Sequence, residues 1–112
     1  MNSFARKPGA ITVATVMVLL TALVFSAFAP ALDNQLMRTW DTYDYVILNQ
    51  HIHQLDANSL LWMLTAFHSS NWHPLTWLSH SIDYALFGVE PFGHHLVSLL
   101  IHWLNTLLVF QL

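Results

Sequence analysis

The sequence predicts an all-α membrane fold in which two transmembrane helices flank an extracytoplasmic segment. Of the 112 residues, 55% are hydrophobic and 8% are charged, whereas a soluble globular domain carries about 25% charged residues. Two apolar runs, residues 10–29 and 94–112, are each long enough to cross a hydrocarbon core of roughly 30 Å at about 1.5 Å per residue. The length allows one small domain at most.

The first apolar run predicts a membrane anchor. Its only polar members are Thr12, Thr15, Thr21 and Ser26. A cleaved signal peptide is the alternative, because Ala27-Phe28-Ala29 imitates an A-x-A cleavage site. Pro30 follows that site, and the run exceeds the 7–15 residues usual for the apolar core of a signal peptide. We therefore expect residues 10–30 to form a transmembrane helix.

The second transmembrane helix, expected over residues 94–112, carries a polar stripe. His95, Ser98, His102 and Asn105 fall at i, i+3, i+7 and i+10, which is one helical face. Polar residues inside a membrane normally face a bundle interior or an aqueous cavity rather than lipid. The stripe therefore predicts further helices beyond this chain, which we expect to be a fragment.

The distribution of charge predicts the orientation in the membrane. Arg6 and Lys7 precede the first apolar run, so residues 1–9 are expected on the cytoplasmic side of the membrane. That membrane is expected to be a bacterial inner membrane or an endomembrane. Residues 31–93 are then periplasmic or lumenal, and the C-terminus returns to the cytoplasm. With three Lys and Arg residues in total, the chain has no basic patch for nucleic acid. With no cysteine, it has no disulfides or thiolate metal sites.

Between the spans we expect two short amphipathic helices lying on the outer membrane surface. Leu60–Phe67 is strongly apolar but too short to cross, and Asp56 or Asn58 is placed to cap it. Pro74 suits the first turn of the next helix, and Gly88 suits its end. The apolar stripe expected on that helix consists of Leu75, Leu78, Ile82 and Leu86.

Polar clusters in the same segment suggest sites. Eight histidines invite a metal hypothesis, but the sequence has no H-E-x-x-H and no two histidines four apart. We therefore expect most histidines to be polar anchors, caps or hydrogen-bonding groups, and assign no metal ligand. Asp41 and Asp44, three apart near the exit of the first helix, suit a base or a cation ligand; a solvated turn is the alternative.

The stretch from about Trp40 to Phe110 resembles the N-terminal membrane region of the transmembrane and tetratricopeptide-repeat proteins, a group similar to protein O-mannosyltransferases. The densest match covers NWHPLTWLSH (71–80), DYALFG (83–88), GHHL (93–96) and LIHWLN (100–105). The resemblance implies part of a C-type glycosyltransferase bundle. Such enzymes transfer a sugar from a polyprenyl-phosphate donor, here to a protein hydroxyl.

The resemblance also implies site residues and partners. An acid in the first outside loop sits at the active site of these folds, which makes Asp41 the expected catalytic carboxylate. Thr42 occupies the position where the family usually carries a second acid, and Asp44 is the alternative candidate for the catalytic carboxylate. The substrate-lining residues expected from the matching motif are His73, His80, Asp83, His94 and His95. Expected partners are membrane lipid, the lipid-linked sugar, a protein acceptor, later helices and 34-residue repeats; a divalent cation is a candidate cofactor.

Two other classes of function stay open. A C-type site needs carrier-phosphate contacts from later helices, so we expect the fragment alone to be inactive. The first alternative is a non-catalytic small membrane interaction protein or a truncated product. The second is a histidine-rich metal or haem membrane protein.

Overall fold

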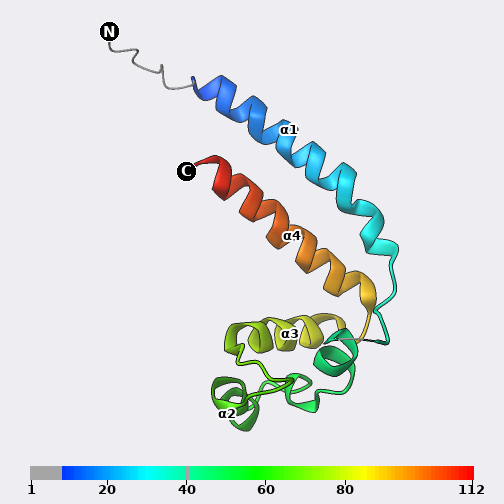
Figure 1. Ribbon diagram of the computed structural model, residues 1–112. Coiled ribbons are helices and arrows are strands. Elements are labelled where there is room, and N and C mark those ends of the chain that lie inside the picture. Colours follow the sequence, from blue (N-terminus) through cyan, green and yellow to red (C-terminus); the bar gives the residue numbers. More distant parts are fainter. Residues whose placement is uncertain (1–8, 40) are drawn as a thin grey trace. The chain divides into compact units, whose positions relative to one another are not determined.

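The computed structural model describes residues 9–39 and 41–112, and its regular elements over these residues are helices (Figure 1). In chain order they are α1 (Ala10–Phe28), η1 (Ala29–Asp33), η2 (Tyr43–Ile47), η3 (Gln50–Ile52), α2 (Ala57–Thr65), α3 (Pro74–Phe87) and α4 (Pro91–Phe110). The all-α class is thus confirmed for the described part of the chain. These residues form two compact units. We call them the helical pair (described residues up to Pro30, with Leu99–Leu112) and the 31–98 unit (Ala31–Ser98).

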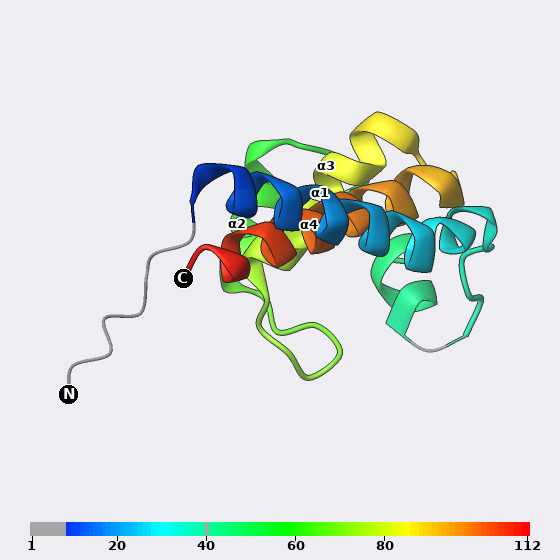
Figure 2. The same ribbon diagram turned by 90° about the horizontal axis from the view of Figure 1, so that it is seen from above.

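The helical pair joins α1 to the second half of α4, and Figures 1 and 2 both show the two segments side by side. The indole Nε1 of Trp103 donates a hydrogen bond of 2.9 Å to the Thr21 hydroxyl. The Trp103 ring also lies 6.1 Å from the Phe25 ring, and the His102 ring meets the edge of Phe28 at 4.8 Å. The contact therefore combines aromatic packing with a satisfied indole N–H.

Two helical segments are long and apolar enough to cross a membrane, Ala10–Asp33 with 24 residues and Pro91–Phe110 with 20. Only 6% of the most apolar stretch of the first is buried, and 22% of that of the second. Large apolar side chains of α1 are therefore exposed, including Ile11, Val18, Leu19 and Leu23. A helix that is apolar on every side is normally buried, either in the core of a large protein or in a membrane. Arg6 and Lys7, on which the predicted orientation rests, lie outside the described residues.

The core of the 31–98 unit forms around Trp77 of α3. Trp77 and Ile52 are completely buried, and Val46 and Met63 complete the buried cluster. Leu36, Tyr45, Trp62 and Leu78 pack around it. The Ser81 hydroxyl donates a hydrogen bond of 2.8 Å to the Ile52 carbonyl. This bond and the cluster hold α3 against η3.

Helix α2 runs from Ala57 to Thr65 and so contains most of the apolar run Leu60–Phe67. Of the two predicted caps, Asp56 and Asn58, Asp56 is the one used. Its carboxylate accepts a hydrogen bond of 2.7 Å from the Ser59 backbone N–H. Asp56 satisfies one of the free N–H groups of the first turn and so fixes the start of the helix.

A tight turn separates α2 from α3. His68 and Asn71 exchange two backbone hydrogen bonds, of 3.0 and 2.9 Å. Between them Ser69 and Ser70 adopt positive φ angles of 49° and 65°. Such angles are uncommon for residues other than glycine, and the paired hydrogen bonds offset their cost.

Helix α3 starts at Pro74 and stops at Gly88 as predicted, and its apolar stripe is mostly exposed. Leu75, Ile82 and Leu86 are 79%, 45% and 68% exposed. The buried residues are instead Trp77, Ser81 and Asp83. The large indole and the Ser81 hydroxyl, which has an acceptor on η3, decide which face packs inward, and the leucine stripe is left free.

Gly88 has a conformation that other residues adopt only with strain, φ 59° and ψ −129°. We predict that Gly88→Ala lowers the free energy of unfolding by about 1–3 kcal/mol, because a β-carbon disfavours this region. Gly9 is a matched control, since its φ is −65° and a β-carbon there meets no atom within 4 Å. Denaturant unfolding followed by circular dichroism measures both variants. Equal losses in the two would show that Gly88 is not specially required.

The cap of α2 predicts an acid dependence of stability. The hydrogen bond from the Ser59 backbone N–H lowers the pKa of Asp56 from its ordinary 3.8. Because the pKa of Asp56 is lower in the folded than in the unfolded protein, its ionised form stabilises the fold at pH values above 3.8, the ordinary value. This stabilisation is lost as the pH falls below 3.8 and through the pKa of the folded state. We expect Asp56→Asn to keep the cap but flatten that part of the acid unfolding curve, whereas Asp56→Ala loses the cap at neutral pH. Unchanged curves for both would contradict the capping role.

Candidate functional site

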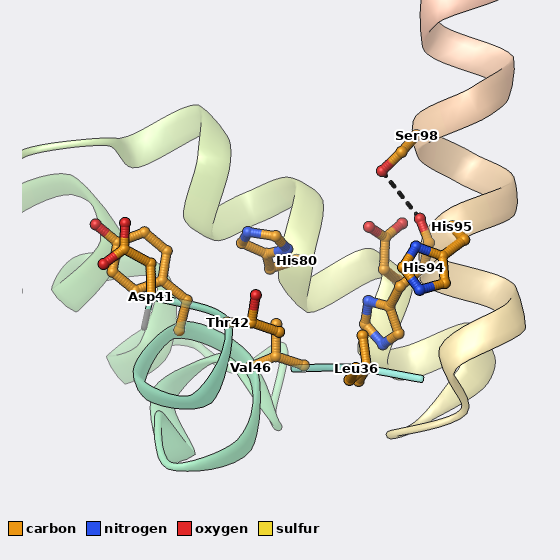
Figure 3. Close-up of a pocket in the computed structure, with 10 residues that line it drawn as sticks. Leu36, Asp41, Thr42, Val46, His80, His94, His95 and Ser98 are labelled. Carbon is orange, nitrogen blue, oxygen red and sulfur yellow. Dashed lines mark hydrogen bonds between the residues drawn. The ribbon is translucent and has the colours of Figure 1, made fainter. Parts of the chain in front are cut away.

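A pocket of about 230 Å³ opens in the 31–98 unit. Its lining residues are Leu36, Asp41, Thr42, Tyr45, Val46, His80, Asp83, His94, His95 and Ser98. They come from the segment around η2, from α3 and from the first turns of α4. In Figure 3 the Asp41 side chain lies on one side of the pocket and His94 and His95 on the other, with His80 between them. The pocket thus combines carboxylates, imidazoles and a small apolar wall.

Asp41 is held at the pocket by the turn that follows it. The turn η2 is a π-helix, a rare element that is frequently found at functional sites. Its Val46 is 3% exposed in the core, and its Tyr45 ring meets the edge of Trp77 at 4.6 Å. Two packed residues of the turn therefore fix the backbone next to Asp41, while the Asp41 side chain itself stays exposed. An exposed carboxylate on an anchored turn suits proton transfer with a bound molecule.

Helix α3 supplies a second polar group to the pocket. His80 and Asp83 are three residues apart and so share a helical face. Asp83 is only 7% exposed, and His80 is half-buried. Burial raises the pKa of the Asp83 carboxyl, opposed by the nearby imidazoles of His94 and His80. Burial also lowers the pKa of His80, against the attraction of Asp83. Burial therefore disfavours the charged form of both side chains, the Asp83 carboxylate and the His80 imidazolium.

Helix α4 brings two adjacent histidines to the pocket. Gly93 lies against the Phe87 ring, where a β-carbon would clash, so the start of α4 packs closely on the end of α3. His94 is 7% exposed, and its Nε2 lies 2.8 Å from the Gly88 carbonyl oxygen. A carbonyl only accepts, so Nε2 carries the proton. His95 Nε2 is buried and has no hydrogen-bond partner within the described structure.

His80, Asp83 and His94 form a compact group. One ring nitrogen from each histidine and one Asp83 carboxylate oxygen all lie within 4.8 Å of one another. Imidazole nitrogens and carboxylate oxygens are both metal ligands. The group can hold a proton between its members or bind a cation.

The structure brings most of the predicted site residues together. Those that line the pocket are Asp41, His80, Asp83, His94 and His95. Asp44 is exposed and is not a lining residue. His73 precedes α3, with its ring 6.4 Å from Tyr45 and 6.1 Å from Trp77. Asp44 and His73, both predicted as site residues, therefore do not line the pocket.

Sequence reasoning missed other features of the site. The lining by Leu36 had no signal in the sequence, because an isolated leucine is an ordinary apolar residue. Tyr45 and Val46 lie inside the stretch that carries the family resemblance, but no lining role was predicted for them. The compact group was missed because histidine pairs were sought at a spacing of four. His80 and Asp83 at a spacing of three gave a local signal, but nothing local tied His94 to them.

No protein-family model, curated protein or solved structure matches this chain. The chemistry of the site is therefore inferred from its own residues, and the family resemblance remains a prediction.

Proposed function

We propose that this chain contributes the membrane region and the catalytic carboxylate of a glycosyltransferase that moves a sugar from a polyprenyl-phosphate donor to a protein hydroxyl. The observation that carries the proposal is the pocket, where Asp41 and four residues of the matching motif meet: His80, Asp83, His94 and His95. Asp41 and His95 are 54 positions apart in the chain. Their convergence in one pocket is what a site assembled from that motif requires.

The chemistry proposed for Asp41 is general-base catalysis. Its carboxylate takes the proton of the acceptor hydroxyl as the oxygen attacks the anomeric carbon of the sugar. The new oxygen–carbon bond forms, the bond from that carbon to the carrier phosphate breaks, and the polyprenyl phosphate leaves with its electron pair. Asp41 is exposed, so an acceptor can reach it.

A membrane location supports access to such a donor. The segments Ala10–Asp33 and Pro91–Phe110 have the length and composition of spans. Contiguous exposed apolar surface on a soluble protein is normally small, whereas α1 exposes apolar side chains along its length. In the proposed arrangement lipid and further helices cover this surface, and the 31–98 unit faces the outer side, where Leu75, Ile82 and Leu86 of α3 rest on the membrane.

The proposal predicts that transfer depends on Asp41. In membranes from cells producing this chain together with the later helices that a C-type site needs, Asp41→Asn should reduce transfer of labelled sugar from a polyprenyl-phosphate donor by about 10²–10⁴-fold, because an amide cannot accept the proton. Asp44→Asn is the matched control, since Asp44 is an exposed acid outside the pocket, and it should retain transfer. Equal activity of Asp41→Asn and the unaltered protein would refute Asp41 as the base. Transfer no greater than in membranes lacking the protein would refute the enzyme proposal.

The proposed topology is tested by cysteine labelling, because the chain has no cysteine of its own. Gln54 and Gln111 are exposed and lie on opposite sides of the membrane in the proposed arrangement. Gln54→Cys should react with an impermeant maleimide in intact cells, and Gln111→Cys only after permeabilisation. Labelling of both in intact cells, or of Gln111→Cys alone, would exclude this arrangement.

A further inference from the structure

We infer that His80, Asp83 and His94 form a binding site for a divalent transition-metal ion, and that Zn²⁺ is the ion their chemistry fits best. One nitrogen of each histidine and a carboxylate oxygen of Asp83 lie within 4.8 Å of one another. Two of the ligands share a face of α3, and the third comes from the first turn of α4. Figure 3 shows His80 and His94 on either side of the same part of the pocket.

The hydrogen bond of His94 prepares it as a ligand. Because Nε2 donates to the Gly88 carbonyl, the neutral ring presents an unprotonated Nδ1. A backbone carbonyl on the second ring nitrogen is the usual partner of a metal-binding histidine, since it fixes the tautomer and the ring orientation. The unusual backbone of Gly88 at the end of α3 places that carbonyl beside His94.

The group also has more acceptors than donors. The Nδ1 atom of His94 and the Asp83 carboxylate both offer lone pairs. The Nδ1 atom of His80 is buried, and no described residue forms a hydrogen bond with it. A buried polar atom without a partner needs an explanation, and a bound ion is one of the explanations that its chemistry allows. A cation at the centre of the group satisfies all three residues at once.

The ligand set favours zinc over the hard cations. Mg²⁺ and Ca²⁺ take oxygen ligands, whereas two imidazoles and a carboxylate form a common three-residue zinc site with an open fourth position. In a tetrahedral site, zinc bonds of about 2.0–2.2 Å place two ligand atoms about 3.3–3.6 Å apart. The three ligand atoms lie within 4.8 Å of one another, so the side chains would have to close by up to about 1.5 Å around a bound ion.

The open position would face the pocket that Asp41 lines. The described lining residues include two carboxylates, those of Asp41 and Asp83, and no lysine or arginine. An anionic phosphate would meet net negative charge there, and a divalent ion would offset it. This role in holding a donor phosphate rests on the proposed function; the metal site itself does not.

The site is tested on the 112-residue chain, purified in detergent and stripped with a chelator. Calorimetric titration with Zn²⁺ should show one tight site per chain, and Co²⁺ should give the absorption bands of a four-coordinate ion. Loss of an outer-shell partner weakens a metal site by about 10–100-fold, so loss of a ligand should cost at least as much. We expect that loss for His80→Ala, for His94→Gln and for Asp83→Asn, which preserves the side-chain shape.

His73→Ala is the matched control, because His73 is a half-buried histidine of the same unit outside the group. It should bind Zn²⁺ as the unaltered chain does, and circular dichroism confirms that each variant remains helical. Absence of stoichiometric Zn²⁺ binding overturns the proposal. Binding that persists in Asp83→Asn and His94→Gln, or that falls equally in His73→Ala, also overturns it.

Inorganic phosphate separates the metal site from the proposed reaction. Added to the Co²⁺-loaded chain, it should shift the absorption bands if the open position accepts an anion. Zn²⁺ binding without sugar transfer in membranes would retain the site and reject the transferase. Transfer that survives chelation and the ligand variants would retain the transferase and reject a role of the metal in holding the donor, while the Zn²⁺ titrations decide whether the site exists.

Discussion

Complete burial of the Trp77 indole is the contact on which the packing of residues 31–98 depends. The ring lies 4.6 Å from Tyr45, 5.5 Å from Trp62 and 5.3 Å from His68, so it joins η2, α2 and the turn after α2 to helix α3. An aromatic side chain buries about 150–250 Å², which is worth roughly 4–6 kcal/mol at about 25 cal/mol per Å². Its Nε1 has no partner in the described structure, at a cost of about 1–3 kcal/mol. Burial wins.

The position of Trp77 fixes what the rest of α3 presents. With Trp77 inward, Ser81 reaches the Ile52 carbonyl one turn later, and His80 and Asp83 line the pocket. The same rotation leaves the leucine stripe of the helix exposed. The hydrophobic core thus places two polar side chains where solvation is poor, and their neighbours must compensate for that loss.

The pocket and the most extensive apolar surface belong to different units of the chain. The 31–98 unit has its own core and contains every lining residue of the pocket. The helical pair buries Val24 of α1 and Leu99 and Leu107 of α4, and α1 otherwise exposes apolar side chains along its length. That division assigns stability to the Trp77 core and chemistry to the pocket, while membrane contact, in the proposed function, falls to α1, α4 and the exposed leucine stripe of α3.

Features that depend on local chemistry could be predicted from the sequence. Two long apolar runs formed helices of spanning length, Pro74 and Gly88 bounded α3, and Asp56 capped α2, because each acts within a turn or two of its own position. The exclusion of His73 and Asp44 from the pocket was not local and was not foreseen.

Only the tertiary structure decided how the site residues combine. His94 joins His80 and Asp83 because Gly93 allows α4 to start against Phe87 and because the Gly88 carbonyl holds the ring. Asp41 reaches the same pocket because η2 is pinned by the core. A sequence pattern records the side chains and their local spacing, but contacts between segments some forty residues apart follow from which face each helix buries. Here that choice followed from the burial of a single indole ring.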